Sequence, residues 1–182
     1  MARTAASSQA SSEGNQQRVF ELVAAGSSVI EACESVGLSK TAYYRWRNAN
    51  IRHVFFYGSL RQGEEGYLEL ALDKYLTFVA QDCIRGKLYD LGLYPGIKPA
   101  KANEDAVTRG ELYRIHDAAV LPILDEFERY VPKGKSLYLR KDVTTVVHKV
   151  HAWAYFLVGE VRQKPLITQG DWLGYKSGVQ IA

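Results

Sequence analysis

The chain has 182 residues, of which 47% are hydrophobic and 24% charged, and its net charge is +3. This length suits one domain, or one domain with a small addition, and the composition is that of a globular protein. The charge is too small to identify a nucleic-acid binder by itself. No signal peptide or run of about 18 apolar residues is present, and Cys33 and Cys83 match neither a disulfide framework nor a metal site. We therefore expect a cytoplasmic protein that does not contact a membrane.

The first part of the chain changes character near residue 16. Residues 1–15 are small and polar, which is typical of a disordered tail. Apolar residues then recur at helical spacing, and Ser27 or Ser28 and later Ser39 stand where a helix N-cap is expected. This pattern predicts three short helices over residues 16–52.

The order of these helices resembles the helix-turn-helix of transposases and resolvases. The turn is Val36-Gly37-Leu38, and Tyr43 and Trp46 form an apolar pair on the third helix, Lys40–Asn48. The resemblance implies that the third helix meets the major groove of DNA. The residues that would then point outward are Lys40, Thr41, Tyr44, Arg45 and Asn48. A small helical bundle that binds no DNA is the alternative.

After Arg52 the sequence has the pattern of strands. His53 to Tyr57 is a short apolar run that Gly58-Ser59 stops, as expected of a buried strand followed by a tight turn. Strand-like runs follow at 84–91, 109–115, 138–147 and 150–158, with a helix at 118–130. Several strands with few helices predict an α+β domain over residues 53–182, with a closed or strongly curled mixed sheet.

Seven short motifs follow one another along this domain in a definite order. They are Tyr57-Gly58-Ser59-Leu60, Leu88-Tyr89 followed by Tyr94-Pro95-Gly96, Arg109-Gly110-Glu111-Leu112-Tyr113, Leu124-Asp125-Glu126-Phe127-Glu128, Tyr138-Leu139-Arg140, Ala152-Trp153-Ala154-Tyr155 and Gly170-Asp171-Trp172. Their order and spacing resemble the gamma-glutamylcyclotransferase-like family over about 120 residues. The resemblance implies a small mixed β-barrel with flanking helices and a cavity at one end. It implies no metal and no organic cofactor.

The resemblance also implies a reaction. Such enzymes cleave γ-glutamyl amides without water, because the substrate's α-amine attacks its own γ-carbonyl and releases 5-oxoproline and an amine. The family pattern makes Glu128 the general acid and base. Residues implied to bind the small γ-glutamyl substrate are Tyr57, Gly58, Ser59, Leu60, Pro95, Tyr138, Arg140 and Tyr155. Arg129 departs from the pattern, because a small residue is common after the acid, and this concerns substrate choice more than chemistry.

Helix geometry favours Glu128 independently of the family. On the helix expected at 118–130, the residues Val120, Leu121, Ile123, Leu124 and Phe127 define one apolar arc. Glu128 lies about 70° from the centre of that arc, Asp125 about 130°, and Glu126 nearly opposite. We expect partial burial to raise the pKa of Glu128 towards a range that suits proton transfer. An ion pair of Glu128 with an arginine such as Arg140 is the structural alternative.

Two functions from different classes remain open at this point. The first is a metal-independent γ-glutamylamine cyclotransferase. The second is a DNA-binding regulator that binds DNA through residues 16–52 and uses the barrel as a ligand sensor. A carboxylate at position 128 favours the enzyme, because a sensor needs the pocket but no base. The helical N-terminal segment favours the regulator, and the leaving amine and the oligomeric state stay open.

Overall fold

The computed structural model describes residues 14–23 and 25–178. The chain divides into two compact units, one that ends at Ile51 and one that begins at Arg52. Most of the predicted tail, residues 1–13, lies outside the described residues, and the first described helix begins at residue 14. None of the helices described is both long and apolar enough to cross a bilayer.

The described part of the first unit consists of three helices around a small core. A helix at residues 14–23 precedes α2 (Val29–Ser35) and α3 (Lys40–Ala49). The Ser28 side chain accepts a hydrogen bond from the Glu31 N–H while the Glu31 carboxylate accepts from the Ser28 N–H, which is a capping box. The Ser39 side chain caps α3, as predicted, by accepting a hydrogen bond from the Ala42 N–H without a reciprocal bond. The fully buried residues are Val19, Ala32, Cys33 and Tyr43.

Four of the five residues expected to point outward from α3 are exposed: Lys40, Thr41, Arg45 and Asn48. Tyr44 differs, because it is half-buried and packs against the small core. Its ring centroid lies 5.4 Å from that of Tyr43, and the Arg47 guanidinium lies 4.8 Å from the Tyr44 ring centroid. The aromatic surface of Tyr44 is therefore partly used within this unit.

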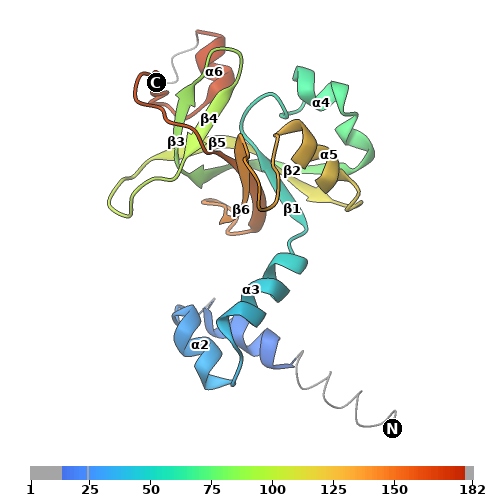
Figure 1. Cartoon of the computed structure of the whole chain (residues 1–182), viewed down its shortest axis with the longest axis vertical. Coiled ribbons are helices and arrows are strands. Elements are labelled where there is room, and N and C mark those ends of the chain that lie inside the picture. The colour runs from blue at the N-terminus through green and yellow to red at the C-terminus, as the bar shows by residue number, and fades with distance from the viewer. Residues whose placement is uncertain (1–13, 24, 179–182) are drawn as a thin grey trace. The chain divides into compact units, whose positions relative to one another are not determined.

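The second unit has a five-stranded sheet, a two-stranded sheet and short helices (Figure 1). The larger sheet consists of β1 (His53–Phe56), β2 (Leu76–Arg85), β5 (Val107–Ile115), β6 (Tyr138–Thr144) and β7 (His151–Leu157). The smaller sheet pairs β3 (Lys87–Asp90) with β4 (Pro95–Lys98). The helices are α4 (Glu65–Glu69), the 3₁₀ turn η1 (Leu72–Lys74), α5 (Val120–Phe127) and α6 (Trp172–Lys176).

Strand β1 is the centre of the larger sheet, whose order is β2-β5-β1-β7-β6. It runs antiparallel to β5 and parallel to β7, where Val54 pairs with Trp153. Val54 and Phe56 point to one face of the sheet, and Phe55 and Tyr57 to the other. Because both faces are covered, the strand is a continuous apolar run instead of an alternating pattern.

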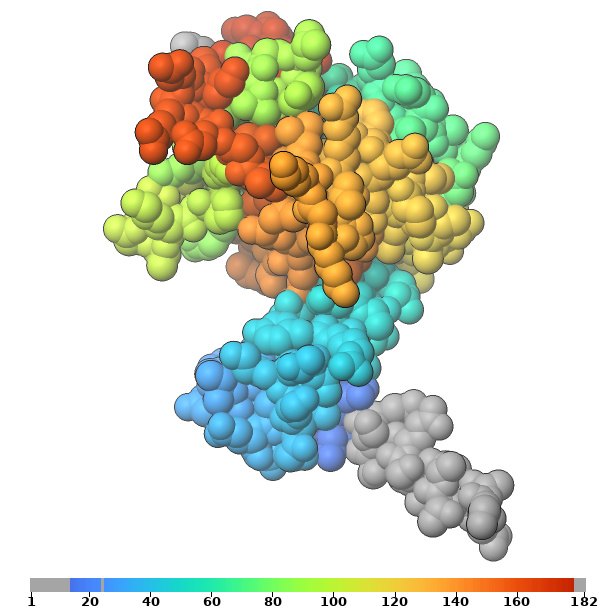
Figure 2. Space-filling model, viewed as in Figure 1, coloured from blue at the N-terminus to red at the C-terminus, as the bar shows by residue number. Residues whose placement is uncertain are grey.

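The two faces of the sheet carry separate core clusters. One cluster joins β1 to α4, η1 and α5, and includes Tyr67, Leu72 and Leu124. The other joins β1 to the β3–β4 hairpin and α6, and includes Ile97 and Trp172. Figure 1 shows α4 and α5 on one side of the sheet and β3, β4 and α6 on the other. In Figure 2 the gold-to-orange surface belongs to the chain from α5 to β7.

The strands differ from the sequence prediction in two respects. The run predicted at 84–91 is divided at Gly86, where a Cβ would lie 2.5 Å from the Ile97 Cδ1, so the chain bends there between β2 and β3. The first half of β2 was not predicted, because Phe78 and Val79 are exposed and the register shifts beside them. In the sheet order of the described residues, β2 and β6 are the outer strands, so the α+β class is confirmed while barrel closure is not shown.

A buried aspartate connects β2 to the turn between β6 and β7. The Asp82 carboxylate accepts hydrogen bonds from the N–H groups of Val147 at 2.9 Å and His148 at 3.1 Å. The Val146 N–H donates to the Cys83 carbonyl at 2.7 Å beside it. Burial alone would raise the pKa of Asp82, but these hydrogen bonds prevail and lower it to about 2. The ionised carboxylate therefore ties β2 to the turn between β6 and β7.

We predict that Asp82→Asn lowers the free energy of unfolding by about 2 kcal/mol at neutral pH, because an amide cannot accept all of these bonds. The folded pKa lies below the usual 3.8, so this stabilisation is present above pH 4 and disappears as the pH falls towards 2. Melting temperatures across pH 2–7 measure the effect, with Asp105→Asn as control because the Asp105 side chain is 98% exposed. A difference between Asp82→Asn and wild type that stays constant down to pH 2 would contradict the assignment.

Candidate active site

A cavity of about 240 Å³ opens where β1 ends and α5 ends. It brings together all the predicted substrate-binding residues except Arg140, together with the predicted acid Glu128. Its lining consists of Phe55, Phe56, Tyr57, Gly58, Ser59, Leu60, Tyr94, Pro95, Phe127, Glu128, Arg129, Leu137, Tyr138 and Tyr155. Five separate segments of the chain thus meet at one end of the larger sheet.

The loop that follows β1 offers backbone donors to this cavity. Among the described residues, the N–H groups of Gly58, Ser59 and Leu60 donate to no carbonyl or side chain, whereas the Gly58 and Ser59 carbonyls accept from Arg61 and Tyr67. A Cβ at Gly58 would lie 2.9 Å from the Pro95 Cγ, so only glycine fits without displacing that ring. Unpaired N–H groups of this kind suit a carboxylate or an oxyanion.

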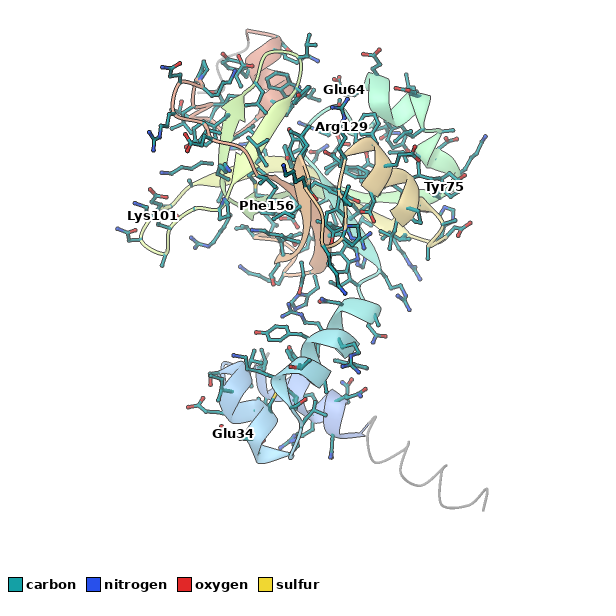
Figure 3. All side chains as sticks on the ribbon, viewed as in Figure 1. Glu34, Glu64, Tyr75, Lys101, Arg129 and Phe156 are labelled. Atoms are coloured by element: carbon teal, nitrogen blue, oxygen red, sulfur yellow. The ribbon has the colours of Figure 1, made fainter. Side chains whose placement is uncertain are left out.

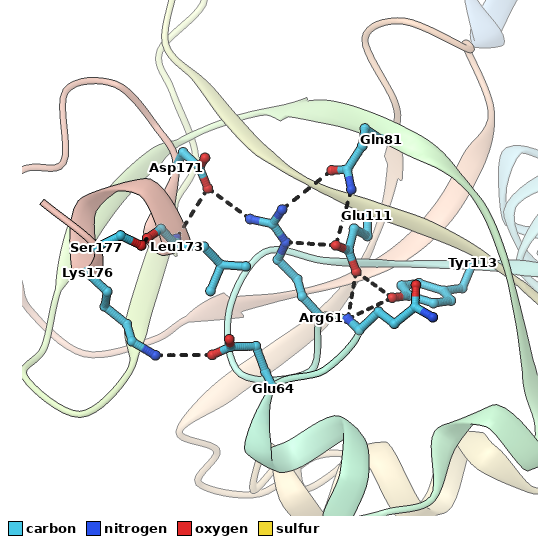
Figure 4. Close-up of polar contacts among 10 residues, drawn as sticks. Arg61, Glu64, Gln81, Glu111, Tyr113, Asp171, Leu173, Lys176 and Ser177 are labelled. Carbon is cyan, nitrogen blue, oxygen red and sulfur yellow. Dashed lines mark hydrogen bonds and ion pairs between the residues drawn. The ribbon is translucent and has the colours of Figure 1, made fainter. Parts of the chain in front are cut away.

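A buried ion-pair network holds this loop from behind (Figure 4). Arg61 directly follows the loop, and its guanidinium lies 3.2 Å from the Glu111 carboxylate and 2.8 Å from that of Asp171. The other Glu111 oxygen accepts from the Gln62 N–H at 2.8 Å and from the Tyr113 hydroxyl. Burial would raise the pKa of Glu111, but these hydrogen bonds and the Arg61 charge lower it below its usual value. The loop is thereby fixed to β5 and α6.

Three tyrosine hydroxyls in the cavity wall are used to fix the wall itself. Tyr57 donates to the Tyr155 carbonyl at 2.7 Å, and Tyr138 donates to the Pro95 carbonyl at 2.8 Å. Tyr155 donates to the Asp125 carboxylate at 2.8 Å. Burial raises the pKa of all three hydroxyls, so they remain protonated donors at neutral pH. These bonds make the cavity wall rigid.

Glu128 is the acidic group that faces the cavity. It is the C-cap residue of α5, half-buried, and no hydrogen bond or ion pair to its side chain occurs among the described residues. Burial raises the pKa of Glu128 to about 8. The part of the carboxyl that stays accessible faces a narrow space with aromatic walls and not bulk solvent, which agrees with the strong desolvation.

Arg140 was predicted to bind the substrate, but it lies outside the cavity lining. Its guanidinium lies 3.0 Å from the Asp125 carboxylate and 5.0 Å from the centroid of the Trp153 ring. Arg140 is adjacent to Tyr155 across the β6–β7 pair, so it stands one layer beneath the cavity. Among the described residues Arg140 pairs with Asp125 and not with Glu128, so the ion pair considered as the structural alternative is not observed.

Six residues of the cavity lining were not predicted as site residues, and two of them, Phe55 and Phe56, belong to the strand that was predicted. Tyr94 lies in a quoted motif from which only Pro95 was selected, and Phe127 was assigned wholly to the core although it is 36% exposed. Leu137 precedes the strand residue Tyr138 without any pattern of its own. Arg129 was noted for its side chain, but its place in the cavity wall follows from the turn after α5 and not from periodicity.

The histidines nearest to carboxylates are each held by one of them. The His148 Nδ1 lies 2.8 Å from Asp82, and the His151 Nδ1 lies 3.1 Å from Asp142. Within the described part of the chain, no group of three or more His, Cys, Asp and Glu side chains is arranged to hold a metal ion.

Comparisons with known proteins agree on the second unit. A family model described as "Gamma-glutamyl cyclotransferase, AIG2-like" matches residues 54–174. Because this match begins at residue 54, the helix-turn-helix resemblance of residues 16–52 is not confirmed. No curated protein matches the chain.

Solved structures have the same fold. An uncharacterized protein from Pyrococcus horikoshii is similar with a TM-score of 0.53 and 21% identity, over 70% of this chain and 94% of that chain. A uropathogenic E. coli-specific protein gives 0.53 and 17%, over 69% and 95%. The Escherichia coli protein ytfP is 31% identical over 68% of this chain and 98% of its own, with a TM-score of 0.49. On the family match, this chain belongs to the gamma-glutamyl cyclotransferase, AIG2-like family and has a cyclotransferase-like function in general.

Proposed function

We propose that the chain cleaves γ-glutamyl amides by intramolecular cyclisation and releases 5-oxoproline and an amine. The observation that carries this proposal is one cavity in which an unpaired, desolvated carboxyl at Glu128 stands with the unpaired N–H groups of Gly58, Ser59 and Leu60. Cyclisation needs both elements, a group that moves a proton and donors for the oxygen that becomes negative.

The proton transfers that the reaction requires are consistent with Glu128 acting as both base and acid. The α-ammonium of a γ-glutamyl compound has a pKa somewhat above the value of about 8 for a peptide N-terminus, because its own α-carboxylate is free, while the pKa of Glu128 in the empty cavity is about 8. Transfer of that proton to the Glu128 carboxylate therefore costs little free energy. The free amine attacks the γ-carbonyl, and protonated Glu128 gives its proton to the departing nitrogen as the C–N bond breaks. The Glu128 carboxylate formed in this way accepts the second proton from the ring nitrogen and passes it to the released amine, which leaves as an ammonium. No water and no metal enter this balance.

The oxyanion formed at the γ-carbonyl needs donors that are already in place. The N–H groups of the loop are fixed by the Arg61 and Glu111 network, so they do not have to reorganise during the reaction. The rigid tyrosine wall favours a folded conformer of the substrate, in which the α-amine lies near the γ-carbonyl. Such positioning of reacting groups is worth several kcal/mol in intramolecular reactions.

We predict that Glu128→Gln reduces kcat for 5-oxoproline release by about 100-fold or more, because glutamine accepts no proton. Glu126→Gln, on the exposed side of α5, is the matched control and should retain nearly wild-type activity. Product release and melting temperature are measured for both variants. Equal activity of the two folded variants would exclude Glu128 as the base.

We predict that kcat/KM has its maximum slightly above pH 8. Below that pH both Glu128 and the substrate amine are protonated, and above it both are deprotonated, so the reactive state with one shared proton is most populated between the two pKa values. A pH–rate profile of 5-oxoproline release checks this expectation. A plateau that is already complete at pH 6 would show that the essential group has an ordinary carboxyl pKa.

A second candidate function is DNA binding by the first unit, with the cyclotransferase-like domain as a ligand sensor. It is supported by the exposed set Lys40, Thr41, Arg45 and Asn48 on the capped helix α3. These side chains have the lengths and donors that recognition helices use on bases and phosphates.

We predict that any duplex binding weakens with salt and that Lys40→Ala with Arg45→Ala reduces the salt slope by roughly one per lost phosphate contact. Fluorescence anisotropy with duplex DNA at several salt concentrations measures this slope. The matched control, Lys133→Ala with Lys135→Ala, removes the same charge from the second unit and should bind like wild type. Equal binding by both double variants would rule out α3 as the DNA-binding surface.

A further inference from the structure

The turn after α5 places an arginine in a backbone position that favours glycine. The Arg129 N–H donates to the Glu126 carbonyl at 3.0 Å and the Tyr130 N–H donates to the Asp125 carbonyl at 2.8 Å, which is the Schellman pattern of a helix end. Arg129 has a φ of 51°, in the left-handed region. A residue with a side chain is less favourable there than glycine, because its Cβ crowds the following carbonyl oxygen.

The left-handed backbone alone is not informative, because Ala71, Lys133 and Lys149 share it. Arg129 differs from these three in that it lines the cavity, where it is the only cation among the lining residues. Within the described part of the chain it forms no ion pair, although the residue before it is the proposed acid. Figure 3 labels Arg129 in the turn after α5. An exposed, uncommitted cation is thus held at the wall of the site despite the backbone cost.

Because Arg129 directly follows Glu128, the position of Glu128 indicates which part of the substrate the Arg129 side chain contacts. Glu128 must reach the departing nitrogen to return its proton, and consecutive Cα atoms lie about 3.8 Å apart. Groups attached one or two bonds beyond that nitrogen therefore come within reach of the Arg129 side chain. Because guanidinium groups bind carboxylates through two parallel hydrogen bonds, a carboxylate is the group that fits there best.

We infer that Arg129 determines specificity in the cavity, selecting γ-glutamyl amides whose leaving amine carries a carboxylate close to its nitrogen. This inference rests on the proposed function for the identity of the leaving amine. Ligands with a neutral amine lose one ion pair, and ligands with a cationic amine meet a like charge. Affinity therefore decreases from ligands whose leaving amine carries a carboxylate, through ligands with a neutral amine, to ligands with a cationic amine. Because the leaving group's carboxylate takes no part in bond making, its loss raises KM more than it lowers kcat.

The substrate's own α-carboxylate is the competing occupant of the Arg129 side chain. It is common to every γ-glutamyl compound, so an interaction there would strengthen the binding of all ligands equally. The loop N–H groups of Gly58, Ser59 and Leu60 offer the γ-glutamyl part of the ligand a separate set of donors. Comparing ligands that differ only in the leaving amine separates the two possibilities.

The experiment measures the Kd of γ-glutamylglycine, γ-glutamylethylamide and γ-glutamylputrescine by calorimetry, in the Glu128→Gln background to prevent turnover. In that background Arg129→Gly removes the cation and suits the left-handed backbone, while Arg129→Lys keeps the charge. Lys133→Gly is the matched control, because it removes a cation from an exposed left-handed position (φ 62°) that does not line the cavity. In parallel, 5-oxoproline release is measured for each ligand with Glu128 intact.

We expect Arg129→Gly to weaken γ-glutamylglycine about ten-fold or more, to leave the ethylamide unchanged and to strengthen the putrescine compound. Arg129→Lys should retain part of the preference, and Lys133→Gly all of it. The preference should shrink as salt is raised, because the guanidinium is exposed.

Three results would overturn the inference: equal affinity of the unsubstituted site for all three ligands, an equal loss for all three in Arg129→Gly, or no binding of any ligand. A preference that depends on Arg129 without 5-oxoproline from any compound would instead overturn the proposed function. The affinity and product assays therefore distinguish the two failures.

Discussion

The cavity depends on the complete burial of strand β1. Val54 is fully buried and Phe55 is 1% exposed, so each face of this strand is covered by a different core cluster. A strand that is paired on both edges and packed on both faces has no freedom to shift its register. The residues that follow it, from Tyr57 to Leu60, therefore leave the sheet at a fixed point and in a fixed direction. The other cavity elements gather around this point.

Two carboxylates at the end of α5 illustrate how environment assigns roles to similar side chains. Asp125 receives the Tyr155 hydroxyl and the Arg140 guanidinium, so its charge is compensated and it contributes to the cavity wall. Glu128, one turn further along the chain, has no such partner among the described residues, and burial raises its pKa to about 8. A difference of this kind between neighbouring acids is what separates a structural carboxylate from one that moves protons. Arg140 supports the site from beneath by engaging Asp125, which leaves Glu128 uncompensated.

Local patterns predicted the elements whose burial is simple. The run from His53 to Tyr57, the Ser28 and Ser39 caps and the α5 segment all appear, because an apolar run or a cap acts over a few residues. The division of the strand at Gly86 was missed because it depends on Ile97, which lies eleven positions away. Arg140 was placed in the cavity because it shares a strand face with Tyr138 and because the family resemblance implied that this face lies near the cavity. Alternation indicates which face of a strand a side chain occupies, but not where that side chain lies relative to the cavity. Here the ion pair with Asp125 holds the Arg140 side chain outside the cavity.

Several groups in the ligand-free site lower the stability of the folded protein, and a bound substrate would offset part of this effect. With a folded pKa of about 8 against the usual 4.5, the neutral Glu128 favours folding at low pH, and this contribution is lost as the pH rises towards 8. The loss is roughly 1.4 kcal/mol for each pH unit in that interval. The N–H groups of Gly58, Ser59 and Leu60 without acceptors and the left-handed Arg129 add to it. An α-ammonium beside Glu128 and oxygens at the loop would compensate the Glu128 carboxyl and the loop N–H groups. A ligand that carries both features is therefore stabilised by groups that have no partner among the described residues.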